Sequence, residues 1–214
     1  MLTFLDPVEK VIRRRRSIRR YKTDMPQQGW IEAAVSCAAL APSPSNTQPV
    51  RFVRICSEEK RQKLQRAMLD RRRQLLEDLE AIGGQKKTRN LINAYFRYSE
   101  FMFTAPVLIG AGTVTGIESF SSKLYEARVL TENNRGETDL DISLGLSLLS
   151  MVLKCESIGL GTCILTAPLA FLTDVEKTLG LEGMRIKCFV TVGFPDETPS
   201  PVEKKSFSEI YSEI

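Results

Sequence analysis

The sequence contains no histidine among its 214 residues. This absence excludes the Ser-His-Asp triad, the Cys-His dyad, the HExxH zinc site and histidine-ligated iron. The cysteines are few, odd in number and outside any CxxC motif, which argues against a disulfide scaffold or a zinc site. They are Cys37, Cys56, Cys155, Cys163 and Cys188. We expect no metal, so any chemistry must come from other side chains or from an organic cofactor.

Long apolar runs are also missing, so the sequence predicts neither a secretory signal nor a membrane span, and we expect a cytoplasmic protein. The net charge of +4 is small for a chain with 26% charged residues. It gives little reason to expect nucleic acid, although it would help to attract an anionic ligand. No linker or internal repeat is visible, and we expect a single domain over residues 1–214.

Hydrophobic periodicity predicts many helices, few strands and no βαβ repeat, which is typical of an α+β fold. We expect Thr138 or Asp139 to cap the long apolar helix and Gly159 to end it. The last predicted strand is apolar on both faces and should be central in its sheet. Helices are predicted over residues 6–16, 27–40, 58–81, up to about 103, 118–130, 140–158 and 168–179, and strands over 50–56, 106–113 and 186–194.

A cluster of cationic side chains, RRSIRRY, occupies residues 15–21. It is either a solvated basic helix end or an anion site, because guanidinium groups bind phosphate in bidentate fashion. If the chain is extended there, Arg15, Ser17 and Arg19 point the same way. Binding of nucleic acid is less favoured, because no exposed aromatic residues are interleaved with the arginines.

A second polar segment is the loop APSPSNTQP at residues 41–49. It is either a proline-rich connector or a binding surface, since its prolines stiffen a backbone that carries several hydrogen-bonding side chains. The polar groups that could contact the edge of a heterocycle are Ser43, Ser45, Asn46 and Gln48.

These two segments, in this order, resemble the signature of the nitroreductase family, as do DISLGLSLLSMVLKCESIGLGTC at 141–163 and VGFPDETPSPVEKKSFSEIY at 192–211. The similarity covers both ends and roughly the last third of the chain, whereas residues 60–103 and 114–138 match little. One departure is Val50, where the family often has an aromatic residue.

The resemblance implies an α+β fold with a mostly antiparallel central sheet flanked by helices. It also implies a homodimer with interlocked termini and two FMN molecules at the interface. Arg15, Arg16 and Ser17 would hold the phosphate and ribityl chain, and Lys204 and Lys205 would complete the phosphate site. Arg19 would lie against the pyrimidine edge of the flavin, and Ser43, Ser45 and Asn46 would reach it from the partner subunit. Backbone groups of Leu165 and Thr166 would lie near N5.

The function that this resemblance implies is transfer of hydride from NADH or NADPH to a small organic acceptor, such as a nitroaromatic or a quinone, by a ping-pong mechanism. No catalytic side chain is needed, because FMN performs the hydride chemistry itself. Arg19 would stabilise the negative charge of the reduced flavin, since guanidinium cannot lose its proton. Two alternatives stay open: a flavin-binding carrier or sensor without turnover, and a basic nucleic-acid-binding module.

The segment GAGTVTG at residues 110–116 also resembles the glycine pattern of a dinucleotide-binding Rossmann turn. No parallel βαβ unit surrounds it in the sequence. We therefore interpret it as a strand that passes close to another backbone.

Overall fold

A four-stranded antiparallel sheet forms the centre of the chain, in the order β1-β2-β4-β3. The computed structural model describes residues 6–118, 120–132 and 136–214. Residues 1–5 and part of the polar stretch 131–138 thus lie outside the described residues. The α+β fold and the mostly antiparallel sheet expected from the sequence are confirmed. The strands are β1 (Val50–Arg54), β2 (Val107–Val114), β3 (Gly161–Leu165) and β4 (Met184–Gly193).

The apolar strand β4 is central, as predicted, because it pairs with β2 on one side and β3 on the other. The glycine pattern in β2 serves this close pairing. A Cβ at Gly112 would lie 1.8 Å from the carbonyl oxygen of Arg185 in β4, so only glycine fits there. Because β2 is antiparallel to both of its neighbours, a Rossmann turn at this position is excluded.

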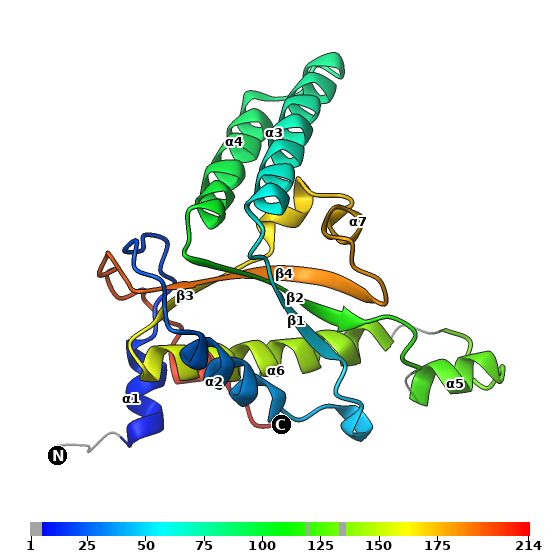
Figure 1. Cartoon of the computed structure of the whole chain (residues 1–214). Coiled ribbons are helices and arrows are strands. Elements are labelled where there is room, and N and C mark those ends of the chain that lie inside the picture. Colours follow the sequence, from blue (N-terminus) through cyan, green and yellow to red (C-terminus); the bar gives the residue numbers. More distant parts are fainter. Residues whose placement is uncertain (1–5, 119, 133–135) are drawn as a thin grey trace.

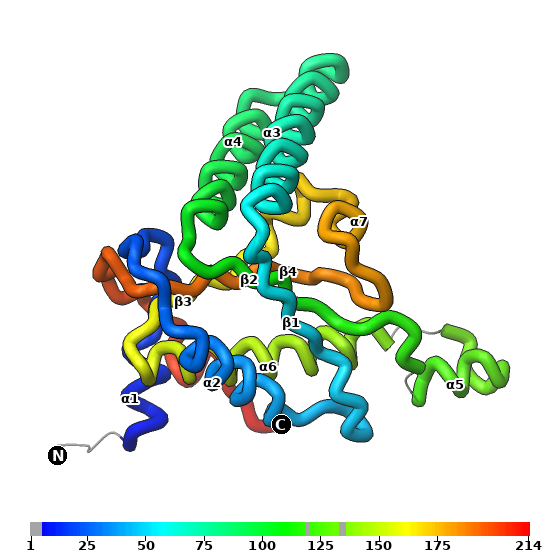
Figure 2. The backbone as a smooth tube through the Cα atoms, in the orientation of Figure 1, coloured from blue at the N-terminus to red at the C-terminus, as the bar shows by residue number. Residues whose placement is uncertain are grey.

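Helices cover both faces of the sheet, and each face has its own apolar core (Figure 1). On one face lie α2 (Gln28–Ala39) and α6 (Gly136–Ser157), which contact alternate residues of β2 and β4. On the other lie α3 (Glu58–Ala81), α4 (Lys86–Glu100) and α7 (Val175–Leu179). The paired helices α3 and α4 stand out from the sheet as a hairpin (Figure 2).

Several helix ends follow the expected capping chemistry. Asp6 accepts a hydrogen bond from the backbone of Glu9 at the start of α1 (Pro7–Arg14). Helix α3 ends before Gly83, whose positive φ of 65° suits glycine. The predicted cap of the long apolar helix was wrong: α6 already begins at Gly136, so Thr138 and Asp139 lie in its first turn. Acidic residues there still favour the helix electrostatically.

The prediction of one continuous helix over residues 168–179 was wrong. The structure has a 3₁₀ turn, η3 (Ala167–Ala170), and then the short α7. Between them, Asp174 adopts non-helical dihedral angles. Phe171, Leu172 and Val175 are all buried in the core beneath α3 and α4, which explains the helix-like apolar spacing that suggested one continuous helix.

The remaining elements are short: η1 (Pro44–Asn46), η2 (Phe101–Phe103), α5 (Phe120–Glu126) and α8 (Phe207–Ile210). Helix α5 covers only part of the helix expected over 118–130, and Arg128 follows it with a positive φ of 59°. Over the described residues, every helix is too short or too polar to cross a bilayer.

Candidate functional site

The arginine segment leaves α1 and continues as extended chain along the outer edge of β3. Ser17 forms a parallel bridge with Thr162, and the backbone N–H of Ile18 donates to the carbonyl of Thr162 at 2.9 Å. Further along, the N–H of Lys22 donates to the carbonyl of Phe194. This is the extended conformation in which alternate side chains point the same way.

The segment lines a cavity of about 460 Å³ together with part of the C-terminal segment. Five of the predicted site residues line it: Arg15, Arg16, Ser17, Arg19 and Lys204. Lys205 is not one of the lining residues. No acidic side chain lines the cavity within the part of the chain that the structure describes. The electrostatic potential inside the cavity is therefore positive and suits an anionic ligand.

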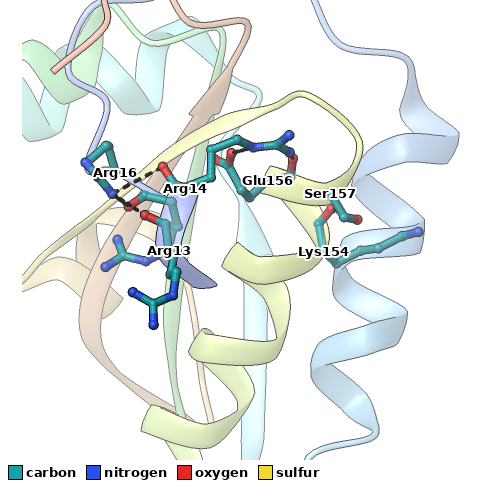
Figure 3. A network of polar contacts seen from close by, with 7 residues as sticks. Arg13, Arg14, Arg16, Lys154, Glu156 and Ser157 are labelled. Atoms are coloured by element: carbon teal, nitrogen blue, oxygen red, sulfur yellow. Dashed lines mark hydrogen bonds and ion pairs between the residues drawn. The ribbon is translucent and has the colours of Figure 1, made fainter. Parts of the chain in front are cut away.

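The Arg16 side chain forms hydrogen bonds with backbone carbonyls at the C-terminal end of α1 (Figure 3). Its Nη1 donates to the carbonyls of Arg13 at 2.7 Å and Arg15 at 2.8 Å, and more weakly to that of Arg14 at 3.3 Å. These are carbonyls that a helix C-terminus leaves without intrahelical partners. The interpretation as a basic helix end thus applies to Arg16, although the residue also lines the cavity.

Several neighbouring arginines are neutralised within the chain. Arg14 donates to the carboxylate of Glu156 at 2.6 Å and to its backbone carbonyl at 2.9 Å (Figure 3). Arg13 pairs with Glu9 one helical turn away. Two of the positive charges at the end of α1 are therefore countered by carboxylates of the same chain, although Arg13 also lines the cavity.

Two glycines make room for the arginine segment. A Cβ on Gly161 would lie 2.7 Å from Cγ1 of Ile18, and one on Gly193 would lie 2.8 Å from the ring of Tyr21. Ile18 is 5% exposed and Tyr21 is half-buried. The Tyr21 hydroxyl contacts the Ile18 carbonyl at 2.5 Å and Thr191 Oγ1 at 2.7 Å. Burial raises the pKa of Tyr21 far above its ordinary value.

A single carboxylate fixes the backbone after Ile18. One oxygen of Glu197 accepts from the N–H of Arg19 at 2.5 Å and from the N–H of Arg20 at 3.1 Å, and the other lies 3.4 Å from Arg20 Nε. Burial alone would raise the pKa of Glu197, but these hydrogen bonds lower it overall. The sequence analysis missed Glu197, because an Asp-Glu pair after a Gly-Phe-Pro turn carries no motif of its own.

The open edge of β3 exposes backbone groups near the arginine segment. The carbonyl of Thr162 faces this edge, because it accepts from Ile18. Backbone groups alternate along a strand, so those of Ile164 face the same edge, whereas those of Leu165 face β4. Thr166 follows the strand and is exposed. The structure thus adds Ile164 to the backbone positions expected from the sequence.

The polar loop is held in a defined conformation by its own hydrogen bonds. Ser43 Oγ accepts from the N–H of Gln48 at 2.9 Å, and Asn46 Oδ1 accepts from Gln48 Nε2 at 3.2 Å. Ser45, Asn46 and Gln48 all have positive φ, between 46° and 52°. Such conformations are costly for residues other than glycine and concentrate at functional sites.

The loop and the arginine segment lie at opposite ends of the α2–α6 layer (Figure 1). The loop borders two cavities of its own, of about 290 and 320 Å³, and neither shares a lining residue with the arginine cavity. Ser43 and Gln48 line the first, and Ser45 lines the second. One chain alone therefore does not bring the two predicted clusters together.

The model of the nitroreductase family matches residues 12–194. The chain belongs to the nitroreductase family. The matched region includes the arginine segment, the polar loop and all four strands, while Lys204 lies beyond it.

Solved structures share this fold across nearly the whole chain. A BluB-like flavoprotein from Clostridium difficile 630 has a TM-score of 0.83 at 21% identity, with 97% of this chain and 98% of that chain covered. A candidate nitroreductase from Desulfovibrio desulfuricans, solved with FMN, has a TM-score of 0.68 at 20% identity, with 98% of both chains covered. An FMN-dependent nitroreductase from Mycobacterium smegmatis, solved with NADPH, has a TM-score of 0.65 at 19% identity, with 96% and 97% covered.

Proposed function

We propose that this nitroreductase-family chain binds FMN as a homodimer and transfers hydride from NADH or NADPH to a small organic acceptor. The observation that carries the proposal is the cationic cavity, in which Arg15, Ser17, Arg19 and Lys204 converge beside the open edge of β3. Family membership supports the chemistry, and the structural relatives solved with FMN and with NADPH support the ligands.

The lining residues suit the phosphate of FMN. Guanidinium, ammonium and hydroxyl groups are its ordinary donors, and the cavity of about 460 Å³ is of the size that small ligands occupy. We assign Arg15, Ser17 and Lys204 to the phosphate and ribityl chain, with Arg16 and Lys205 as neighbouring charges. Arg16 contributes only through donors that the end of α1 does not use.

The isoalloxazine ring would extend from the phosphate along the open edge of β3, where Ile164 presents backbone groups and Thr166 is exposed, its carbonyl accepting from Leu169. FMN, when bound, supplies the hydride chemistry, so no side chain has to donate or accept hydride. Arg19 would place a permanent positive charge near the pyrimidine edge and stabilise negative charge there. The absence of histidine is consistent with this division of labour.

The homodimer is supported by α6, which is apolar on two sides. One side is buried beneath the sheet, and the other leaves Ile142 53%, Leu146 38% and Leu149 49% exposed. A helix that is apolar all round is normally buried, so a second chain should cover this side. A partner would also bring a second copy of the polar loop, so that Ser43, Ser45, Asn46 and Gln48 could reach the flavin of the neighbouring chain.

The C-terminal arm, residues 201–214, supports interlocked termini. All of its residues are exposed in the single chain, including Phe207 at 71%, Ile210 at 71% and Tyr211 at 51%. Val202 and Lys204 line the arginine cavity of their own chain, but the apolar side chains that follow them are exposed, and packing against a partner would bury those side chains.

The test begins with the absorption spectrum of the purified protein and identification of any chromophore released by heat. FMN released in a ratio of one per chain supports the site. Oxidation of NADH or NADPH that requires an added acceptor then supports the enzyme, whereas bound FMN without turnover would favour a carrier or sensor. A protein that contains no flavin and takes up none contradicts the proposal.

A further inference from the structure

We propose that Glu197 is the positioning residue for Arg19: it fixes the backbone from which Arg19 reaches the flavin, without touching the cofactor itself. This inference rests on the proposed function, because it assigns Glu197 a part in the same site. Its geometric basis is the paired acceptance of the N–H groups of Arg19 and Arg20 by one carboxylate oxygen.

The surroundings of Glu197 explain why one carboxylate is sufficient. Its side chain is only 18% exposed, so the hydrogen bonds operate with little competition from water. Its second oxygen pairs with Arg20, which keeps that cation at Glu197. Glu197 does not line the cavity, so a bound anion would meet Arg19 without also meeting the carboxylate.

Glu197 completes a rigid frame around this part of the chain. Ile18 is fixed before Arg19 by the edge of β3, and Tyr21 is fixed after it by Thr191. Among the described residues, Glu197 alone accepts from the N–H groups of the two residues between these anchors, while the carbonyl of Arg20 accepts from the N–H of Asp196 at 3.0 Å. Its removal should therefore loosen Arg19 and Arg20 while the two anchors persist.

The direct test is hydrogen exchange in the flavin-free chain, comparing Glu197→Ala with the wild type. We expect faster exchange confined to the peptide that contains residues 19 and 20. Asp196→Asn is the matched control, because it removes one negative charge from the adjacent, exposed position. Unchanged exchange in Glu197→Ala overturns the inference even if the wild type binds FMN. A wild-type chain that takes up no FMN overturns both this role and the proposed function.

A second measurement separates positioning from a general structural role. We expect Glu197→Ala to bind FMN about tenfold more weakly, as for loss of a charge-assisted hydrogen bond, and to shift the flavin midpoint potential to a more negative value. Glu197→Gln keeps an acceptor oxygen and should recover part of both effects. In the double variant with Arg19→Ala, the Glu197→Ala shift in potential should disappear, because Glu197 acts through Arg19. Additive shifts in potential, or none in Glu197→Ala, overturn the positioning role.

Discussion

At the scale of single residues, the site depends on which arginines already have hydrogen-bond or ion-pair partners within the chain and which face the cavity. Arg14, Arg16 and Arg20 have partners in Glu156, the carbonyls at the end of α1, and Glu197. Within the part of the chain that the structure describes, the guanidinium of Arg19 donates to the Ser17 carbonyl alone, at 3.5 Å. These differences are invisible in the sequence of residues 14–20, in which all the arginines look equivalent.

The first residue-scale prediction concerns Arg19→Ala. We expect weaker FMN binding, by roughly ten- to a hundredfold if a charged hydrogen bond is lost, and a more negative flavin midpoint potential. Titration of the flavin-free protein measures the first effect, and spectroelectrochemistry measures the second. Lys22→Ala is the control, because Lys22 is exposed and does not line the cavity. If both quantities match the wild type, Arg19 does not face the flavin.

The second residue-scale prediction concerns alkaline pH and Tyr21. Burial raises the pKa of Tyr21 above its ordinary 10.0, partly countered by the hydrogen bond with Thr191. The folded chain keeps a proton that the unfolded chain releases, so the contribution to stability is full below pH 10 and is lost as the pH rises above it. The melting temperature should therefore fall more steeply above pH 10 in the wild type than in Tyr21→Phe. Parallel curves for the two proteins would contradict this role of Tyr21.

At the scale of elements, the close packing of the arginine segment against the sheet determines the shape of the site. We predict that Gly161→Ala destabilises the fold by about 1–3 kcal/mol, because the new methyl group would overlap Cβ and Cγ1 of Ile18. It should also lower the FMN content by displacing Ser17 and Arg19. Gly29→Ala is the control, since nothing lies within 4 Å of a Cβ there. Thermal unfolding and flavin content would report the two effects, and equal results for both variants would refute this account.

In the polar loop, one substitution can separate the backbone strain at a positive φ from contact of the side chain with FMN. We predict that Asn46→Gly lowers FMN occupancy with little loss of stability, because glycine tolerates the φ of 52° and the intrachain contact that is removed is one exposed hydrogen bond from Gln48 Nε2 at 3.2 Å. Thr47→Ala serves as the control, because Thr47 lies in the same loop with ordinary dihedral angles. Occupancy is measured from the ratio of flavin to protein absorbance. Full occupancy in Asn46→Gly would mean that the loop does not contact the cofactor.

The sequence predicted elements well where local periodicity decides them, as in α2, α3, β2 and β4. It did not predict β3, because Gly161–Leu165 follows a helix-ending glycine and forms a strand only through pairing with β4. It also overextended the helix at 168–179, because the apolar spacing of Phe171, Leu172 and Val175 is helical although the chain is interrupted at Asp174. The arginine cavity was predictable in its members but not in its anchors, since Tyr21 and Glu197 act through distant partners.

At the scale of the whole molecule, the second apolar side of α6 predicts association. We expect the wild type to have the mass of a dimer by light scattering and Leu149→Glu to be largely monomeric, because the charge would be buried at the contact. The monomer should also lose flavin if both chains build the site. Ile82→Glu, at the tip of the α3–α4 hairpin, is the control. A Leu149→Glu protein that stays dimeric would place the contact elsewhere.

The α3–α4 hairpin connects β1 to β2, two strands that are neighbours in the sheet. The N–H of Ile55, just after β1, donates to Leu108 in β2 at 2.8 Å, and Arg61 reaches the carbonyls of Ala105 and Pro106. The half of the hairpin next to the sheet belongs to the core, because Leu64, Met68 and Phe96 are buried there. The far tip, where Ile82 is 80% exposed, contributes nothing to that core, and because both ends of the hairpin are held together at the sheet, the tip can change in length without moving the strands.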